Sequence, residues 1–171
     1  MTKQVIAISG SLRTGSSNSA VLEALIALAP GNLRIILFDI AQLPHFNPDL
    51  DENPPEIVRR FKKLIAESSA FILSTPEYAH GIPGVLKNML DWLVSSEEFY
   101  QMLVSLVYAR PAPFAHASLM EILKTMNARV PQDVIVVLPS IRPKLTNNGK
   151  IEDPEVLDEL RHFLDRLSQA M

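Results

Sequence analysis

The sequence predicts an α/β protein built on a parallel sheet that helices cover on both faces. Short apolar runs rich in β-branched residues recur along the chain, and each is followed by a longer segment whose apolar positions have helical spacing. The short runs are continuously apolar rather than alternating, which is typical of strands buried on both faces. We therefore expect the 171 residues, 1–171, to form one domain of this class.

Five segments have the composition of buried strands. In chain order, residues 4–9 contain Val-Ile-Ala-Ile, residues 33–38 contain Ile-Ile-Leu-Phe, and residues 70–74 contain Phe-Ile-Leu. Residues 103–108 and 133–137 contain Leu-Val-Ser-Leu-Val-Tyr and Val-Ile-Val-Val. Helices are predicted at residues 18–29, 55–67, 83–94, 115–127 and 154–168, several with proline near the first turn, where its missing N–H costs little.

Five alternating strands favour a doubly wound, three-layer sheet in the flavodoxin-like order 2-1-3-4-5. In this order strand 2 lies on one side of strand 1 and strand 3 lies on the other side. The loops after strands 1 and 3 therefore open a crevice, which is where ligands bind in such sheets. These loops, residues 10–18 and 75–84, are also the two most distinctive segments of the sequence.

The composition excludes several classes of function. Charged residues make up 20% of the chain and the net charge is −3, so no overall positive field attracts nucleic acid or an anionic membrane. The chain has no cysteine, which removes thiolate catalysis and cysteine-ligated metals, and its four histidines show no zinc-binding spacing. We expect no metal site. No signal peptide or transmembrane run is visible, so we expect a cytoplasmic protein.

The loop after strand 1 predicts an anion site. It runs from a strand into a helix, which directs backbone N–H groups and the positive end of the helix toward one point. Its arginine adds a charge with fork geometry suited to phosphate oxygens. The candidate ligands are Ser11, Arg13, Ser16, Ser17 and Asn18.

Two better-known phosphate loops do not fit this segment. Gly10 and Gly15 have the spacing of a P-loop, but Ser16 replaces the lysine that triphosphate chemistry needs. Leu12 replaces the second glycine of the dinucleotide fingerprint. A terminal phosphate monoester fits best, and the structural alternative is a turn whose serine and asparagine side chains only cap the helix.

The loop after strand 3 combines prolines and glycines into a stiff, exposed backbone. Such a loop can present N–H groups to the pyrimidine edge of a flavin, with Tyr78 or His80 against the ring system. Hydride reaches flavin N5 directly, so no catalytic side chain is required. His80 either transfers a proton or only borders the ring or solvent, and we favour the second interpretation. The candidate residues are Pro76, Glu77, Tyr78, Ala79, His80 and Gly81.

Together the two loops resemble those of the NADPH-dependent FMN reductase family. The chain carries that family's G-S-x-R-x-x-S-x-N pattern from Gly10 to Asn18 and its P-E-Y-x-x-x-x-P-G-x-L-K-N pattern from Pro76 to Asn88. The resemblance implies that the first loop holds the phosphate of FMN and that the second borders the isoalloxazine. It also implies a homodimer or homotetramer that uses NADPH or NADH as co-substrate and reduces a small acceptor: a quinone, a flavin, an azo compound or a metal oxyanion.

The chain departs from its relatives in two places. The loop after strand 4 is Ala-Arg-Pro-Ala-Pro rather than glycine-rich, and Arg110 in it either reaches a phosphate of the cofactor or dinucleotide or lies in solvent. Ala79 replaces the relatives' asparagine. The leading hypothesis is an FMN-dependent NAD(P)H oxidoreductase; the alternatives are a flavodoxin-like electron carrier and a non-catalytic flavin-binding protein. The sequence indicates neither the acceptor nor a preference for NADH or NADPH.

Overall fold

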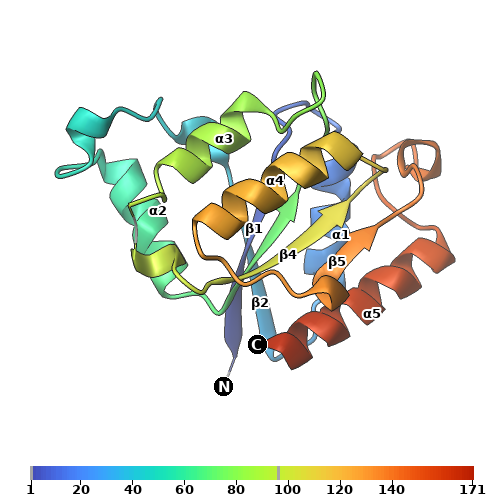
Figure 1. The fold of residues 1–171 in the computed structure, drawn as a ribbon. Coiled ribbons are helices and arrows are strands. Elements are labelled where there is room, and N and C mark those ends of the chain that lie inside the picture. The colour runs from blue at the N-terminus through green and yellow to red at the C-terminus, as the bar shows by residue number, and fades with distance from the viewer. Residues whose placement is uncertain (1, 96) are drawn as a thin grey trace.

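The computed structural model describes residues 2–95 and 97–171, and its centre is a five-stranded parallel sheet (Figure 1). The strand order is β2-β1-β3-β4-β5, which confirms the predicted flavodoxin-like topology. The strands are β1 (Lys3–Ser9), β2 (Leu33–Phe38), β3 (Ala70–Ser74), β4 (Leu103–Tyr108) and β5 (Ile135–Val137).

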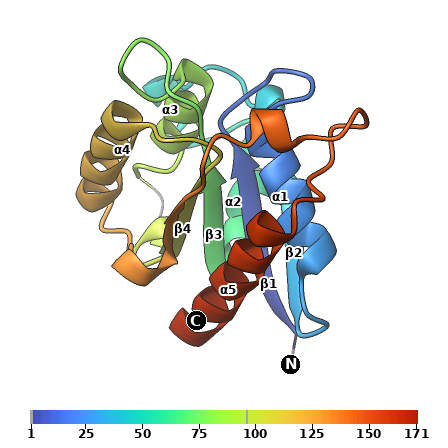
Figure 2. The same ribbon diagram turned by 90° about the vertical axis from the view of Figure 1, so that its right-hand side faces the viewer.

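Helices cover both faces of the sheet (Figure 2). Helices α1 and α5 pack on one face, and α2, α3 and α4 pack on the other. Their bounds are α1 (Ser17–Leu28), α2 (Glu56–Ala66), α3 (Gly84–Asp91), α4 (Pro113–Thr125) and α5 (Pro154–Ala170). None of the helices in the described residues is long and apolar enough to cross a membrane.

The alternation of side chains along β1 shows how one apolar strand serves two cores. Ile6 and Ile8 belong to the core under α2, α3 and α4, whereas Val5 and Ala7 belong to the core under α1 and α5. All four side chains are fully buried. Because successive side chains of a strand point to opposite faces, a strand between two helical layers must be apolar at every position.

The predicted boundaries of β1, β5 and the five helices shift by one to three residues, and three of these shifts have a clear local reason. Strand β5 begins two residues later than predicted, because a 3-10 turn (Gln132–Val134) precedes it. Helix α4 begins at Pro113 rather than Ala115, since proline fits the first helical position. Helix α3 ends at Asp91, where the N–H of Leu93 bonds to the carbonyl of Leu90 in a tighter turn than the predicted continuation to residue 94.

The asparagine of the second motif, Asn88, has a structural role. Its Oδ1 accepts a 2.7 Å hydrogen bond from the N–H of Phe46, and its Nδ2 donates to the carbonyl of Pro44 at 3.0 Å. The buried Trp92 donates to the same carbonyl at 2.9 Å. These bonds hold the connection between β2 and α2 against α3.

Candidate functional site

A cavity of about 220 Å³ lies at the carboxyl edge of the sheet, where the loops after β1 and β3 diverge. This is the position that the predicted strand order assigns to a ligand. Loops after β4 and β5 complete its wall. The residues that line it are Ser11, Arg13, Ser16, Ser17, Asn18, Pro76, Tyr78, Ala109, Arg110, Ser140 and Arg142.

The loop from β1 to α1 folds through its own short polar side chains. Ser16 is the N-cap of α1, and its side chain accepts a hydrogen bond from the N–H of Asn18. The Ser11 hydroxyl accepts from the N–H of Arg13, and the N–H of Ser16 donates to the Arg13 carbonyl. Gly15 lies between them at φ +66°, a left-handed conformation that glycine adopts without steric cost. Capping therefore accounts for one of the five predicted donors, Ser16.

Several donors of this loop remain available. The backbone N–H groups of Thr14, Gly15 and Ser17 donate to no other residue in the described part of the chain. The side chain of Asn18 is buried, and its Oδ1 accepts a 3.1 Å hydrogen bond from the Ser74 hydroxyl of β3. The side-chain nitrogen, Nδ2, has no partner among the described residues. The helix start thus offers free N–H groups where an anion is stabilised.

Three arginines meet at this cavity: Arg13, Arg110 and Arg142. Within residues 2–95 and 97–171, none of their guanidinium groups forms a hydrogen bond or an ion pair. No aspartate or glutamate is among the residues that line the cavity. Three unpaired cations around a small cavity repel one another, and a bound anion relieves that repulsion. The donor set therefore fits a phosphate group.

The loop from β3 to α3 projects from the edge of the sheet as a hairpin (Figure 1). Tyr78 and Gly81 exchange two backbone hydrogen bonds of 3.0 Å, and Ala79 and His80 form the turn at φ 48° and 59°. A two-residue turn with both central residues in the left-handed region favours Asn-Gly. The hairpin uses the N–H groups of Tyr78 and Gly81, so fewer backbone donors of this loop remain for a flavin than the sequence suggested.

Replacing Ala79 with glycine is expected to stabilise the protein by about 1 kcal/mol, because the left-handed conformation costs a residue with a Cβ roughly that much. The matched control is Ala117→Gly on the exposed side of α4, where glycine should cost about 0.5–1 kcal/mol. Urea unfolding midpoints measure both changes. Stabilisation by Ala79→Gly together with destabilisation by Ala117→Gly supports the turn geometry. Destabilisation by both variants would contradict it.

Glu77 points away from the cavity toward the start of α4. Its Oε2 accepts hydrogen bonds of 2.8 Å and 2.9 Å from the N–H groups of Phe114 and Ala115. A carboxylate at a helix N-terminus is stabilised both by these bonds and by the helix dipole. The sequence interpretation placed Glu77 at the flavin, whereas its side chain caps a helix.

His80 also lies outside the lining of the cavity. Its ring stacks on Phe114 with 4.2 Å between the ring centroids. Tyr78 lines the cavity and is 53% exposed, so it is the aromatic side chain of this loop that a ligand can reach. The role of His80 as a residue that only borders the ring or solvent stays a prediction.

Another tyrosine lies nearby in the core of the α4 face. Tyr108, at the end of β4, is almost completely buried, and its hydroxyl lies 3.1 Å from Nδ1 of His116. Burial raises the pKa of Tyr108 above its usual value, so the hydroxyl stays protonated at neutral pH. This pair anchors α4 against the sheet.

Seven of the eleven predicted residues line the cavity: Ser11, Arg13, Ser16, Ser17, Asn18, Pro76 and Tyr78. Glu77, Ala79, His80 and Gly81 do not line it. The sequence interpretation missed Ala109, Ser140 and Arg142 and left Arg110 undecided. One signal was available, because Arg110 and Arg142 each precede a proline in a loop that follows a strand at this edge.

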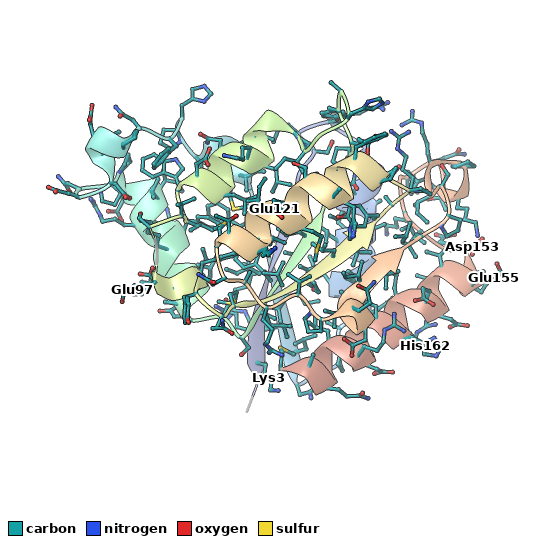
Figure 3. All side chains as sticks on the ribbon, viewed as in Figure 1. Lys3, Glu97, Glu121, Asp153, Glu155 and His162 are labelled. Carbon is teal, nitrogen blue, oxygen red and sulfur yellow. The ribbon has the colours of Figure 1, made fainter. Side chains whose placement is uncertain are left out.

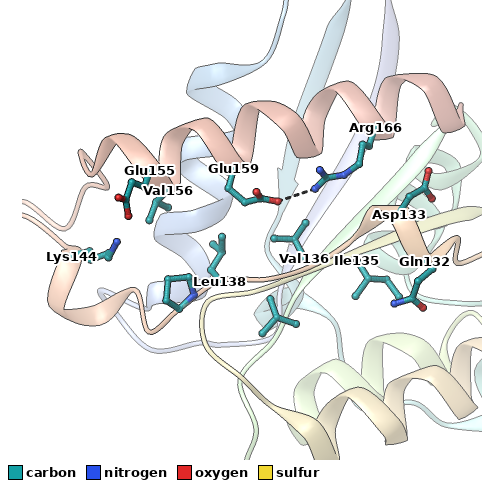
Figure 4. A pocket seen from close by; sticks show the side chains of 12 residues that line it. Gln132, Asp133, Ile135, Val136, Leu138, Lys144, Glu155, Val156, Glu159 and Arg166 are labelled. Carbon is teal, nitrogen blue, oxygen red and sulfur yellow. Dashed lines mark hydrogen bonds and ion pairs between the residues drawn. The ribbon is translucent and has the colours of Figure 1, made fainter.

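A second cavity, of about 590 Å³, lies between β5 and α5 (Figure 4). It contains none of the predicted site residues, and an ion pair of 2.9 Å between Glu159 and Arg166 lies along it. It lies beside the edge strand rather than at the point where the strand order reverses. The smaller cavity is therefore the candidate ligand site.

The described residues contain no group of three histidine or acidic side chains that could hold a metal ion. His162 lies on the exposed outer face of α5, and Glu121 lies on the exposed outer face of α4 (Figure 3).

Comparison with known sequences decides the family. The sequence pattern of the NADPH-dependent FMN reductase family matches residues 4–142. The chain belongs to this family. Membership confirms the resemblance carried by the two loops.

The individual relatives that match the chain are also named as reductases. The chain is 41% identical over 92 residues to a 2-hydroxy-1,4-benzoquinone reductase of a Burkholderia species, covering 54% of this chain and 50% of the relative. It is 44% identical over 90 residues to an NAD(P)H-dependent FMN reductase of Pseudomonas aeruginosa, covering 52% and 49%. The chain thus spans about half the length of the curated relatives it matches.

Among solved structures, the fold is similar to that of FerB, an NAD(P)H:(acceptor) oxidoreductase of Paracoccus denitrificans. The TM-score is 0.84 at 28% identity, and the likeness covers 98% of this chain and 96% of that one.

Proposed function

We propose that this chain binds FMN in the cavity between the β1 and β3 loops and passes reducing equivalents from NAD(P)H to a small acceptor. The observation that carries the proposal is the unpaired donor set around the α1 N-terminus, at the ligand position of the sheet. Family membership supports the same cofactor.

The residues of the first loop would hold the phosphate. The free N–H groups of Gly15 and Ser17, the Ser11 hydroxyl and the Asn18 amide surround the helix start, and Arg13 supplies a full positive charge. Charge-assisted hydrogen bonds of this type are about twice as strong as neutral ones. No aspartate or glutamate lines the cavity to oppose the phosphate.

The residues of the second loop would border the isoalloxazine ring. Pro76 and Tyr78 line the cavity, and the hairpin keeps Tyr78 in place through two backbone bonds. FMN bound at this position would supply the two-electron redox chemistry. The described residues around the cavity include no histidine or carboxylate, so the proposed role of the chain is to bind and orient, and protons come from solvent.

For the acceptor we propose a quinone, because relatives of the chain are named quinone reductases and 2-hydroxy-1,4-benzoquinone reductase. A flavin, an azo compound or a metal oxyanion remains the alternative from the sequence. Assembly into a homodimer or homotetramer is likewise a proposal, which rests on the family. A cytoplasmic location is a proposal that rests on the sequence.

Anaerobic rapid mixing tests the function. The purified protein should be yellow and release FMN rather than FAD, and mixing with NADPH or NADH should bleach the bound flavin. Adding a benzoquinone should then restore the colour. Bound FMN that neither nucleotide bleaches would indicate the electron-carrier alternative, and protein that binds no FMN would refute the proposal altogether.

A further inference from the structure

Arg110 and Arg142, here called the arginine pair, form a wall of the cavity that the phosphate of FMN does not need. They come from the loops after β4 and β5, whereas Arg13 comes from the loop after β1. A phosphate monoester carries about −1.5 to −2 charges at pH 7. Arg13 and the positive end of α1 already supply about 1.5 charges of opposite sign. The arginine pair is therefore in excess of one phosphate group.

The backbone holds the pair together. The N–H of Ile141 donates a 3.0 Å hydrogen bond to the carbonyl of Ala109, so the residues immediately before the two arginines are bonded to each other. Each arginine is followed by a proline, which restricts the backbone of the residue before it. The two arginines are thus carried on adjacent, constrained segments, and both line the cavity.

An ion pair anchors the segment that carries Arg142. This residue begins a 3-10 turn (Arg142–Lys144), and Lys144 Nζ lies 2.9 Å from Asp153 Oδ2. Asp153 is itself the N-cap of α5. The segment is therefore fixed to the start of a helix while Arg142 remains unpaired among the described residues.

The positive charge of the cavity contrasts with the net negative charge of the chain. The protein carries a net charge of −3, yet its cavity presents three guanidinium groups that have no partner among the described residues, and no carboxylate is among the lining residues. Such a concentration of positive charge in a cavity attracts a ligand that carries several negative charges. The Ser140 hydroxyl, which lines the same wall, adds a neutral donor.

The geometry points to the arginine pair as the subsite for the phosphate groups of the nicotinamide dinucleotide. This inference rests on the proposed function and extends it, because it names the residues that recognise the reductant. Both NADH and NADPH carry a pyrophosphate, and NADPH adds a 2′-phosphate. Guanidinium groups bind either through bidentate, charge-assisted bonds.

The test uses the redox-inactive nucleotides NADP⁺ and NAD⁺, titrated calorimetrically into FMN-loaded and FMN-free protein. The variants are Arg110→Gln and Arg142→Gln, with Arg60→Gln as the matched control. Arg60 is an exposed arginine on α2 that has no hydrogen bond or ion pair within the described part of the chain. Each variant of the pair should weaken NADP⁺ binding about tenfold or more, the effect of one charge-assisted contact. Arg60→Gln should change neither nucleotide nor FMN affinity, and each variant of the pair should weaken FMN binding by less than it weakens NADP⁺ binding.

The outcomes distinguish which phosphate groups of the nucleotide the arginine pair binds. Equal losses for NAD⁺ and NADP⁺ assign the pair to the pyrophosphate, and a loss for NADP⁺ alone assigns it to the 2′-phosphate. Unchanged nucleotide binding, wild-type protein that binds neither nucleotide, or a loss of FMN affinity instead would each overturn the inference. Failure of the wild-type protein to bind FMN or to be bleached would instead count against the proposed function.

Discussion

Replacing Gly10 with alanine is expected to destabilise the protein by about 1–3 kcal/mol, the usual cost of overpacking. A Cβ at this position would lie 2.5 Å from Thr75 Oγ1 and 2.9 Å from Thr75 Cβ. The backbone cannot yield easily, because the N–H of Gly10 donates a 2.8 Å hydrogen bond to the carbonyl of Ser74. FMN affinity should fall as well, since Gly10 and Thr75 directly precede the two cavity-lining residues Ser11 and Pro76.

Urea unfolding and FMN titration measure these effects. Gly31→Ala is the control, because a Cβ there meets no atom within 4 Å, and its effect should stay within about 0.5 kcal/mol. The cost of Gly10→Ala should also shrink in a Thr75→Ala background, which removes the nearest atom. Equal stability of the Gly10 and Gly31 variants would show that the two loops do not approach as closely as described.

Arg13→Ala is expected to weaken FMN binding by about 1.5–3 kcal/mol, the range for a hydrogen bond to a charged group. This corresponds to a loss of affinity of about tenfold to 150-fold. Fluorescence titration of FMN into the apoprotein measures the change. Stability should be unaffected, because the Arg13 side chain forms no bond to any other described residue.

Riboflavin provides the decisive comparison for Arg13, since it has the ring system of FMN without the phosphate. Its affinity should be the same for wild-type protein and for Arg13→Ala, and an Arg60→Ala control should leave both affinities unchanged. FMN affinity that does not respond to Arg13→Ala would refute the phosphate assignment. Equal losses for FMN and riboflavin would place Arg13 at the ring instead.

Much of the fold is predictable because buried parallel strands leave a strong local signal. β2, β3 and β4 have the predicted bounds, since each is a mainly apolar run between polar or turn residues. The start of β5 was wrong because Val134 is as apolar as the strand that follows, although it belongs to a 3-10 turn. Apolar composition reports burial, and burial alone does not distinguish a turn from a strand.

The site is predictable only where topology and local sequence coincide. The loops after β1 and β3 follow from the strand order, and seven of their residues do line the cavity. The roles of Arg142 and Glu77 depend on contacts far along the chain. Arg142 reaches the cavity because Ile141 bonds to Ala109, and Glu77 caps a helix that starts 36 positions later, at Pro113. No spacing rule in the sequence encodes either contact.

The Glu77 cap also has a consequence for how the site admits its ligands. The base of the hairpin is bonded to the first turn of α4 through Glu77, and its tip rests on the same turn through the stack of His80 on Phe114. The hairpin can therefore move relative to α4 only by breaking the Glu77 hydrogen bonds and the His80–Phe114 stack. We expect the cavity to bind the proposed ligands without closure of the hairpin over them.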